Sequence, residues 1–222
     1  LKQGFGHYDD QFDLKKYKHI DLGAIQRPGH LVMDAALAWL DGRKDAPFFA
    51  WIHLYDPHLP YEPPEPYRSE YGGRGQAGLY AGEVAFMDEQ IGRLAAWLER
   101  TGLDKSTVLV LVGDHGEGLG SHGEGSHGYY IYDYAIHVPL IVVAPGKVAA
   151  GARVREMVQL IDVMPTLLEM LRLPAPPGHD FKDRRHAPGP LLDPDLAALR
   201  QQALDVVAQA PARDVRNAMN NL

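Results

Sequence analysis

Five consecutive apolar residues, Val108 to Val112, constrain the fold of this chain more than any other feature. Side chains alternate between the faces of a strand, so a wholly apolar strand must be covered on both faces. Similar runs occupy residues 47–54 and 139–144, and residues 80–100 repeat apolar side chains at helical spacing before Gly102, a typical helix stop. Strands over 47–54, 107–112 and 139–144 that alternate with helices predict a layered α/β fold.

Weaker patterns complete the expected organisation of the chain. The other predicted elements are a strand over 153–160 and helices over 30–40, 162–171 and 195–209. Asp162 is expected to cap its helix, because a carboxylate there can accept a hydrogen bond from the first turn. We predict a catalytic domain over residues 1–190 and a helical tail over 191–222.

Composition excludes several classes of protein. The net charge of −7 and pI near 5.8 argue against nucleic-acid binding, although a bound metal could still attract an anionic substrate. Without cysteine, the chain has no disulfide and no thiolate chemistry. No run of about 18 apolar residues occurs that could span a membrane. The oligomeric state is left open.

The loop of residues 113–128, rich in glycine and histidine, carries the strongest chemical signal. Asp114 and His115 follow a buried strand directly, and both residue types bind divalent metals. His127 could fold back to donate to an anionic oxygen or to protonate a leaving group. The alternative interpretation is a solvated loop or an adventitious metal site.

A second histidine-containing loop follows the predicted strand over 47–54. His58 lies between Pro57 and Pro60, which stiffen the loop, and the alternative for it is an exposed loop histidine. His53 is interpreted as a hydrogen-bonded core histidine, and Asp56 as a residue that orders the turn.

Other polar residues are interpreted as structural. Three acidic side chains on the polar side of the long helix are expected to be solvated, namely Glu83, Asp88 and Glu89. The scattered histidines are expected to be surface or structural residues, namely His7, His19, His30, His137, His179 and His186.

Several ordered segments resemble the sulfatase family of the alkaline phosphatase superfamily. They are residues 48–64, 80–92, 113–120, 137–142 and 159–168, and their order fits from Gly4 to Leu173. By this resemblance, Asp114 and His115 are the second pair of metal ligands. His127 matches the lysine or histidine that contacts sulfate or phosphate, and His58 matches a substrate-binding histidine.

Two parts of the family pattern are not found in this sequence. These are the first acidic metal-binding pair and the Cys/Ser-x-Pro-x-Arg element whose first residue becomes formylglycine, and Asp9-Asp10 is a poor substitute for the pair. The resemblance therefore implies the C-terminal portion of the catalytic domain. The implied fold is a layered α/β/α structure with a largely parallel or mixed sheet, incomplete at its N-terminal side.

The resemblance implies a metal-dependent sulfuric ester hydrolase that acts on a sulfate or phosphate ester of a small molecule or glycan. Ca²⁺ or Mg²⁺ is favoured, with Mn²⁺ or Zn²⁺ as alternatives, and a periplasmic or extracellular location is implied. One alternative is a phosphodiesterase, phosphonate ester hydrolase or phosphoethanolamine-type transferase of the same superfamily. Another is a non-catalytic, truncated or degenerate domain.

Two expectations follow. First, Asp114, His115, His127 and His58 should converge on one pocket, because both loops leave strands at their carboxyl ends. Second, the 222-residue chain alone should be poorly soluble and show no sulfatase turnover. If it did turn over, the first nucleophile candidates would be Ser121, Ser126 and Tyr129.

Overall fold

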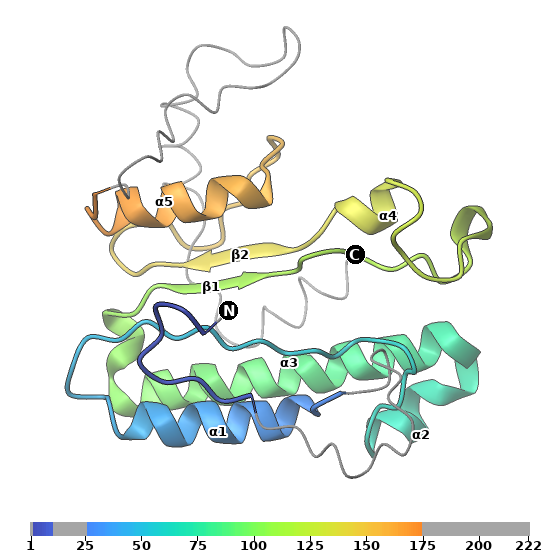
Figure 1. The fold of residues 1–222 in the computed structure, drawn as a ribbon, viewed down its shortest axis with the longest axis horizontal. Helices are drawn as coiled ribbons and strands as arrows, with labels where there is room; N and C mark the ends of the chain where they lie inside the picture. Colours follow the sequence, from blue (N-terminus) through green and yellow to red (C-terminus); the bar gives the residue numbers. More distant parts are fainter. Residues whose placement is uncertain (1, 11–25, 175–222) are drawn as a thin grey trace, which may run out of the picture. The chain divides into compact units, whose positions relative to one another are not determined.

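The computed structural model describes residues 2–10 and 26–174, which belong to two compact units, one up to residue 104 and one from residue 105 (Figure 1). Each unit is described by itself. The predicted helix over 195–209, the domain boundary at 190, and His19, His179 and His186 lie outside the described residues. No helix within the described ranges is long and apolar enough to cross a membrane.

The first unit is built on two long helices, α1 (Gly29–Asp41) and α3 (Gly75–Thr101). Their apolar faces pack together around a core that includes Met33, Leu40 and Trp97, each about 1% exposed. The indole nitrogen of Trp97 donates to Asp41 at 2.7 Å, which satisfies a polar group at the edge of this core. Both helices were predicted.

The end of α3 is also as predicted. Gly102 adopts a left-handed conformation with φ of 73°, which costs glycine little, and its N–H donates to carbonyls of the last helical turn. The helix begins five residues before its predicted start, after the short α2 (Tyr67–Tyr71) and the 3₁₀ turn η3 (Gly72–Arg74). A further 3₁₀ turn, η4 (Leu103–Lys105), follows it.

The second unit contains an antiparallel pair of strands, β1 (Leu109–Val112) and β2 (Leu140–Val143). Leu109 lies opposite Val143 and Val112 opposite Leu140. The last residue of β1 and the first residue of β2 therefore lie side by side at the same end of the strand pair. The remaining elements of this unit are η5 (Ser121–Gly123), α4 (Asp133–Ile136), η6 (Leu160–Asp162) and α5 (Val163–Met170). A small core forms around Ala144, Val148 and Met170.

Three local predictions were wrong. Residues 47–54 are extended but not part of a sheet, because no described strand pairs with their backbone; Phe49 and Trp51 are 69% and 68% exposed. Residues 153–160 form no strand, and charged residues interrupt their apolar pattern. Asp162 precedes α5, but its carboxylate accepts from Gln159 N at 3.0 Å rather than from the first turn of that helix.

Candidate functional site

The glycine-rich loop of residues 113–128 leaves β1 and folds back on itself. Gly118 N donates to Ser126 O at 3.0 Å, and Gly120 N donates to Glu124 O at 2.9 Å. These bonds make the returning half of the loop run beside its first half. Residues near 127 are therefore brought back to residues near 117.

Close backbone contact fixes the loop against α4. Gly116 N donates to Ala135 O at 2.9 Å, and a Cβ atom at position 116 would lie 1.9 Å from Tyr134 O. Only glycine fits at this distance, so the sequence Asp114-His115-Gly116 is locked to the segment that leads into β2.

This contact predicts that Gly116→Ala destabilises the folded protein by about 1–3 kcal/mol or more, because the added methyl group must displace backbone atoms. The matched control is Gly125→Ala in the same loop, where a Cβ atom would meet nothing within 4 Å. Urea unfolding of the full-length protein would measure both changes in free energy. Equal midpoints for the two variants would contradict the packing argument.

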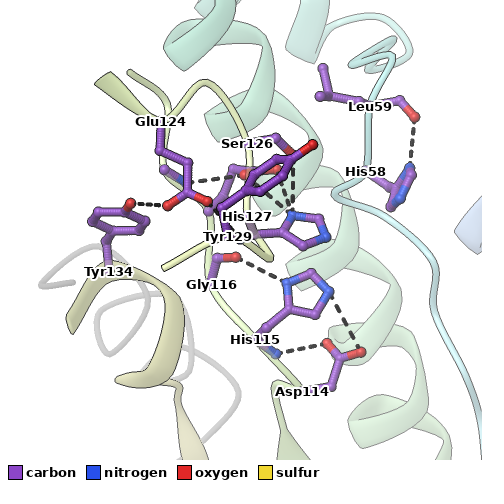
Figure 2. Close-up of polar contacts among 12 residues, drawn as sticks. His58, Leu59, Asp114, His115, Gly116, Glu124, Ser126, His127, Tyr129 and Tyr134 are labelled. Carbon is purple, nitrogen blue, oxygen red and sulfur yellow. Dashed lines mark hydrogen bonds and ion pairs between the residues drawn. The ribbon is translucent and has the colours of Figure 1, made fainter. Parts of the chain in front are cut away.

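Asp114 and His115 present two metal-binding atoms at the end of β1. His115 Nδ1 lies 2.9 Å from Gly116 O, and since a carbonyl only accepts, Nδ1 carries the hydrogen (Figure 2). In the neutral ring, Nε2 then keeps the lone pair that a metal requires. Nε2 lies 3.8 Å from Asp114 Oδ2, and Asp114 Oδ1 accepts from His115 N at 3.0 Å.

These two side chains fit a divalent metal. A separation of 3.8 Å can be spanned by one ion about 2.0–2.5 Å from each donor. Both side chains are accessible, with exposures of 80% for Asp114 and 43% for His115. Within residues 2–10 and 26–174, no group of three or more His, Cys, Asp or Glu residues could hold a metal. Among the described residues, Asp114 and His115 are thus a candidate pair of ligands and not a complete metal site.

His127 lies directly against His115. Their ring centroids are 3.9 Å apart with an interplanar angle of 30°. His127 Nδ1 lies 3.3 and 3.4 Å from the two carboxylate oxygens of Glu117, and 3.3 Å from Ser126 Oγ. The loop therefore brings together the predicted residues Asp114, His115 and His127. Sequence reasoning missed Glu117.

Glu124 holds the far end of this loop. Its carboxylate accepts from Tyr129 N at 2.9 Å and from the Tyr134 hydroxyl (Figure 2). The Tyr134 hydrogen bond lowers the pKa of Glu124, while burial and the adjacent carboxylate raise the pKa of Tyr134 to about 12. The carboxylate and the protonated phenol are therefore the stable forms, and they fix the turn after His127.

The loop that carries His58 belongs to the first unit and is tied down by hydrogen bonds. His58 Nδ1 lies 2.6 Å from Leu59 O, Nε2 lies 3.2 Å from the Tyr55 hydroxyl, and the Tyr55 ring stacks at 4.4 Å. Gln26 Nε2 donates to Leu59 O at 2.8 Å. His58 is half-buried, not an exposed loop histidine.

Glu83 of α3 holds this loop by accepting hydrogen bonds from its backbone. It is 2% exposed and accepts from His58 N at 3.1 Å and Glu62 N at 2.6 Å. The prediction that Glu83 and Asp88 are solvated was wrong. The His58 loop covers Glu83, and Asp88 is 8% exposed. Burial raises the pKa of Glu83 from 4.5 to about 7.

The raised pKa predicts a pH-dependent stability. The folded chain binds this proton more tightly than the unfolded chain, so the free energy of unfolding should fall as pH rises from about 4.5 to about 7. The contribution of Glu83 is about 2–3 kcal/mol. Glu83→Gln should flatten this part of the pH profile, measured by urea unfolding, whereas Glu99→Gln, an exposed change in the same helix, should leave it unchanged. Parallel profiles for wild type and Glu83→Gln would contradict burial as the cause.

Three other sequence interpretations can be compared with the structure. The carboxylate of Asp56 accepts from Gly29 N at the start of α1 at 2.9 Å, and burial raises its pKa, while its role in ordering its own turn stays a prediction. His53 is exposed, so the core interpretation was wrong. Asp9 pairs with Arg27 at 3.1 Å. His58 lies in the other unit from Asp114, and their convergence stays a prediction.

Comparisons with known proteins bear on the family and the fold of this chain. The multifunctional alkaline phosphatase superfamily protein PehA of Trinickia caryophylli is 27% identical over 71% of this chain and 42% of its own length. The chain is thus similar to a protein of the alkaline phosphatase superfamily. A family model described as Sulfatase matches residues 3–173, more than half of the 222 residues, so the chain belongs to the sulfatase family.

Two further comparisons concern a curated relative and the fold. Human arylsulfatase D is 28% identical over 66% of this chain and 26% of its own length. A protein solved in complex with its substrate D-glucosamine-2-N,6-O-disulfate shares the fold with a TM-score of 0.58 at 20% identity, over 69% of this chain and 50% of that one. The mixed helix-and-strand fold with a partial sheet is thus confirmed. The chain spans less than half the length of PehA and arylsulfatase D.

Proposed function

We propose that the full-length protein hydrolyses sulfate esters with a divalent metal, and that the loop of residues 113–128 supplies part of its active site. The observation that carries this proposal is the arrangement of Asp114 and His115. His115 Nδ1 is anchored on Gly116 O, so Nε2 is available beside the Asp114 carboxylate at 3.8 Å. Membership of the sulfatase family supports sulfate as the group transferred.

Local charge supports the need for a metal. Residues 106–146 contain no lysine or arginine, but they contain Asp114, Glu117, Glu124 and Asp133. An anionic sulfate would therefore be repelled by this segment unless a cation, a protonated histidine or both were present. When bound, a divalent ion would polarise an ester oxygen and activate the nucleophile. Carboxylate ligands favour Ca²⁺ or Mg²⁺, whereas His115 suits Mn²⁺ or Zn²⁺.

The histidines have separate roles in this proposal. In its protonated form, His127 donates a hydrogen bond through Nε2 to a sulfate oxygen or to the leaving group, and His58 binds the substrate from its own loop. The substrate is a sulfate ester of a small molecule or glycan. This sequence has no cysteine and no Ser-x-Pro-x-Arg element, so the 222-residue chain alone should show no turnover.

The second candidate is phosphoryl transfer. It is favoured by PehA, a multifunctional protein of the alkaline phosphatase superfamily, which covers 71% of this chain. A phosphodiester and a sulfate ester present similar anionic oxygens, so the residues described above could serve either reaction.

The test compares aryl sulfate, aryl phosphodiester and phosphonate ester substrates with the full-length protein before and after chelation. Turnover of the aryl sulfate should be lost on metal removal and restored by one of the four ions. Activity that survives thorough metal removal would refute metal dependence, and preference for the phosphodiester would favour the second candidate. No turnover of any ester would favour a non-catalytic domain. The 222-residue chain is assayed alone in parallel.

A further inference from the structure

The side chain of Glu117 is 6% exposed and contacts His127 of the candidate site. Gly118 N donates to its Oε1 at 3.0 Å, and the same oxygen lies 3.3 Å from His127 Nδ1. A buried carboxylate is costly unless its oxygens accept hydrogen bonds, so these contacts account for its position. Neither the family resemblance nor the proposed function gives Glu117 a role.

The contact determines which nitrogen of His127 carries hydrogen. An ionised carboxylate only accepts hydrogen bonds, so Nδ1 must be the donor to Glu117. Ser126 Oγ, 3.3 Å from the same nitrogen, can share that hydrogen. In the neutral ring, Nε2 is then the atom with the lone pair; in the protonated ring, Nε2 is a donor.

We propose that Glu117 is a positioning residue that acts through His127. By accepting from Nδ1–H, it fixes the rotation of the ring and, in the neutral ring, the tautomer; only the protonated ring carries the Nε2–H that donates to a substrate oxygen. The ring contact of 3.9 Å with His115 means that rotation of His127 would also disturb the metal-binding residue. This proposal rests on the proposed function, because it assigns Glu117 to the same site.

Kinetics of the full-length protein provide the first test. E117A should lower kcat/KM for an aryl sulfate by about 10–100-fold, as loss of a supporting hydrogen bond to a site histidine typically does. E117Q should lose less, because its amide oxygen can still accept from Nδ1–H. The double variant E117A/H127A should be no slower than H127A alone, since Glu117 would have nothing left to act on. Losses that multiply in the double variant would overturn the proposal.

The tautomer of His127 provides a second test that does not need turnover. Protein with ¹⁵N-labelled histidine is studied by long-range ¹H–¹⁵N correlation at a pH where the ring is neutral, and the H127A spectrum assigns the signal. Wild type and E117Q should show hydrogen on Nδ1, whereas E117A should move it toward Nε2. If E117A does not fold, E117D withdraws the carboxylate by one methylene group and should have the same effect.

The two tests separate this proposal from the proposed function. Wild-type protein that hydrolyses no sulfate ester would end the proposed function, while the NMR spectra would still decide the Glu117–His127 hydrogen bond. A sulfatase whose His127 tautomer is unchanged in both E117A and E117D would overturn the positioning role alone. Glu117 would then only support the loop through Gly118 N.

Discussion

Asp114→Ala in the full-length protein should reduce kcat/KM for an aryl sulfate by about three orders of magnitude or more. The Lewis-acid contribution of a metal is worth several kcal/mol, and each 1.36 kcal/mol corresponds to about tenfold in rate. Removing Asp114 leaves His115 as the only donor of the pair described here. Asp114→Asn keeps the shape but loses the charge, and should fall between wild type and alanine.

Metal content separates this effect from unfolding. The metal bound per protein, measured by plasma mass spectrometry after dialysis, should fall in Asp114→Ala and in His115→Ala. The control is Asp133→Ala, which removes an exposed carboxylate from the same unit and should retain both metal and activity. Full activity with full metal content in Asp114→Ala would show that this residue is not a ligand.

The elements that could be predicted from sequence are those whose stability is local. In α1 and α3, one face of each helix is apolar, and Gly102 permits a left-handed end. For β1 and β2, an unbroken apolar run indicates a strand without any knowledge of its partner. Residues 47–54 have the same pattern but form no strand, because a strand also requires a backbone partner.

The residues that sequence reasoning missed are acidic groups whose burial depends on distant contacts. Glu83 occupies the polar side of α3 in a helical pattern, yet backbone N–H groups more than twenty positions away, at His58 and Glu62, bind it there. Glu117 and Glu124 lie in a glycine-rich loop with no periodicity to indicate which face is buried. One signal was available in the sequence for two of them: Glu117 lies two positions from His115, and Glu124 lies three positions from His127. Glu83 lies near the His58 loop only in the folded structure.

The proximity of Asp114, His115 and His127 could be predicted because all three lie in the loop that leaves a buried strand, and their roles stay proposals. The antiparallel pairing of β1 and β2 holds the first residue of this loop in a fixed position. Gly113 N donates to Pro139 O at 3.1 Å, so the strand pair continues up to the residue before Asp114. The proposed metal ligands therefore begin where the paired strands end.

The next largest predicted loss of activity concerns His58 and His127. In the full-length protein, each alanine substitution should lower kcat/KM by about 10²–10³-fold, the typical cost of removing one donor to a developing negative charge. If both contact one substrate, the double variant should lose less than the product of the single losses, because the residues act as a unit. His53→Ala, an exposed histidine of the same segment, serves as the control and should remain within about twofold of wild type.

A distance measurement tests the same convergence without turnover. The 222-residue sequence contains no cysteine, so once any cysteine elsewhere in the full-length protein is replaced, cysteines introduced at positions 58 and 127 can be cross-linked selectively. A reagent that spans about 15 Å should join them, since a ligand pocket of ordinary size is no wider. Cysteines at positions 53 and 127 provide the comparison pair, and the yield should be lower because His53 is not assigned to the pocket. No cross-link at 58 and 127, together with additive kinetic losses, would mean that His58 serves a different site, and the assignment of one pocket to both loops would be abandoned.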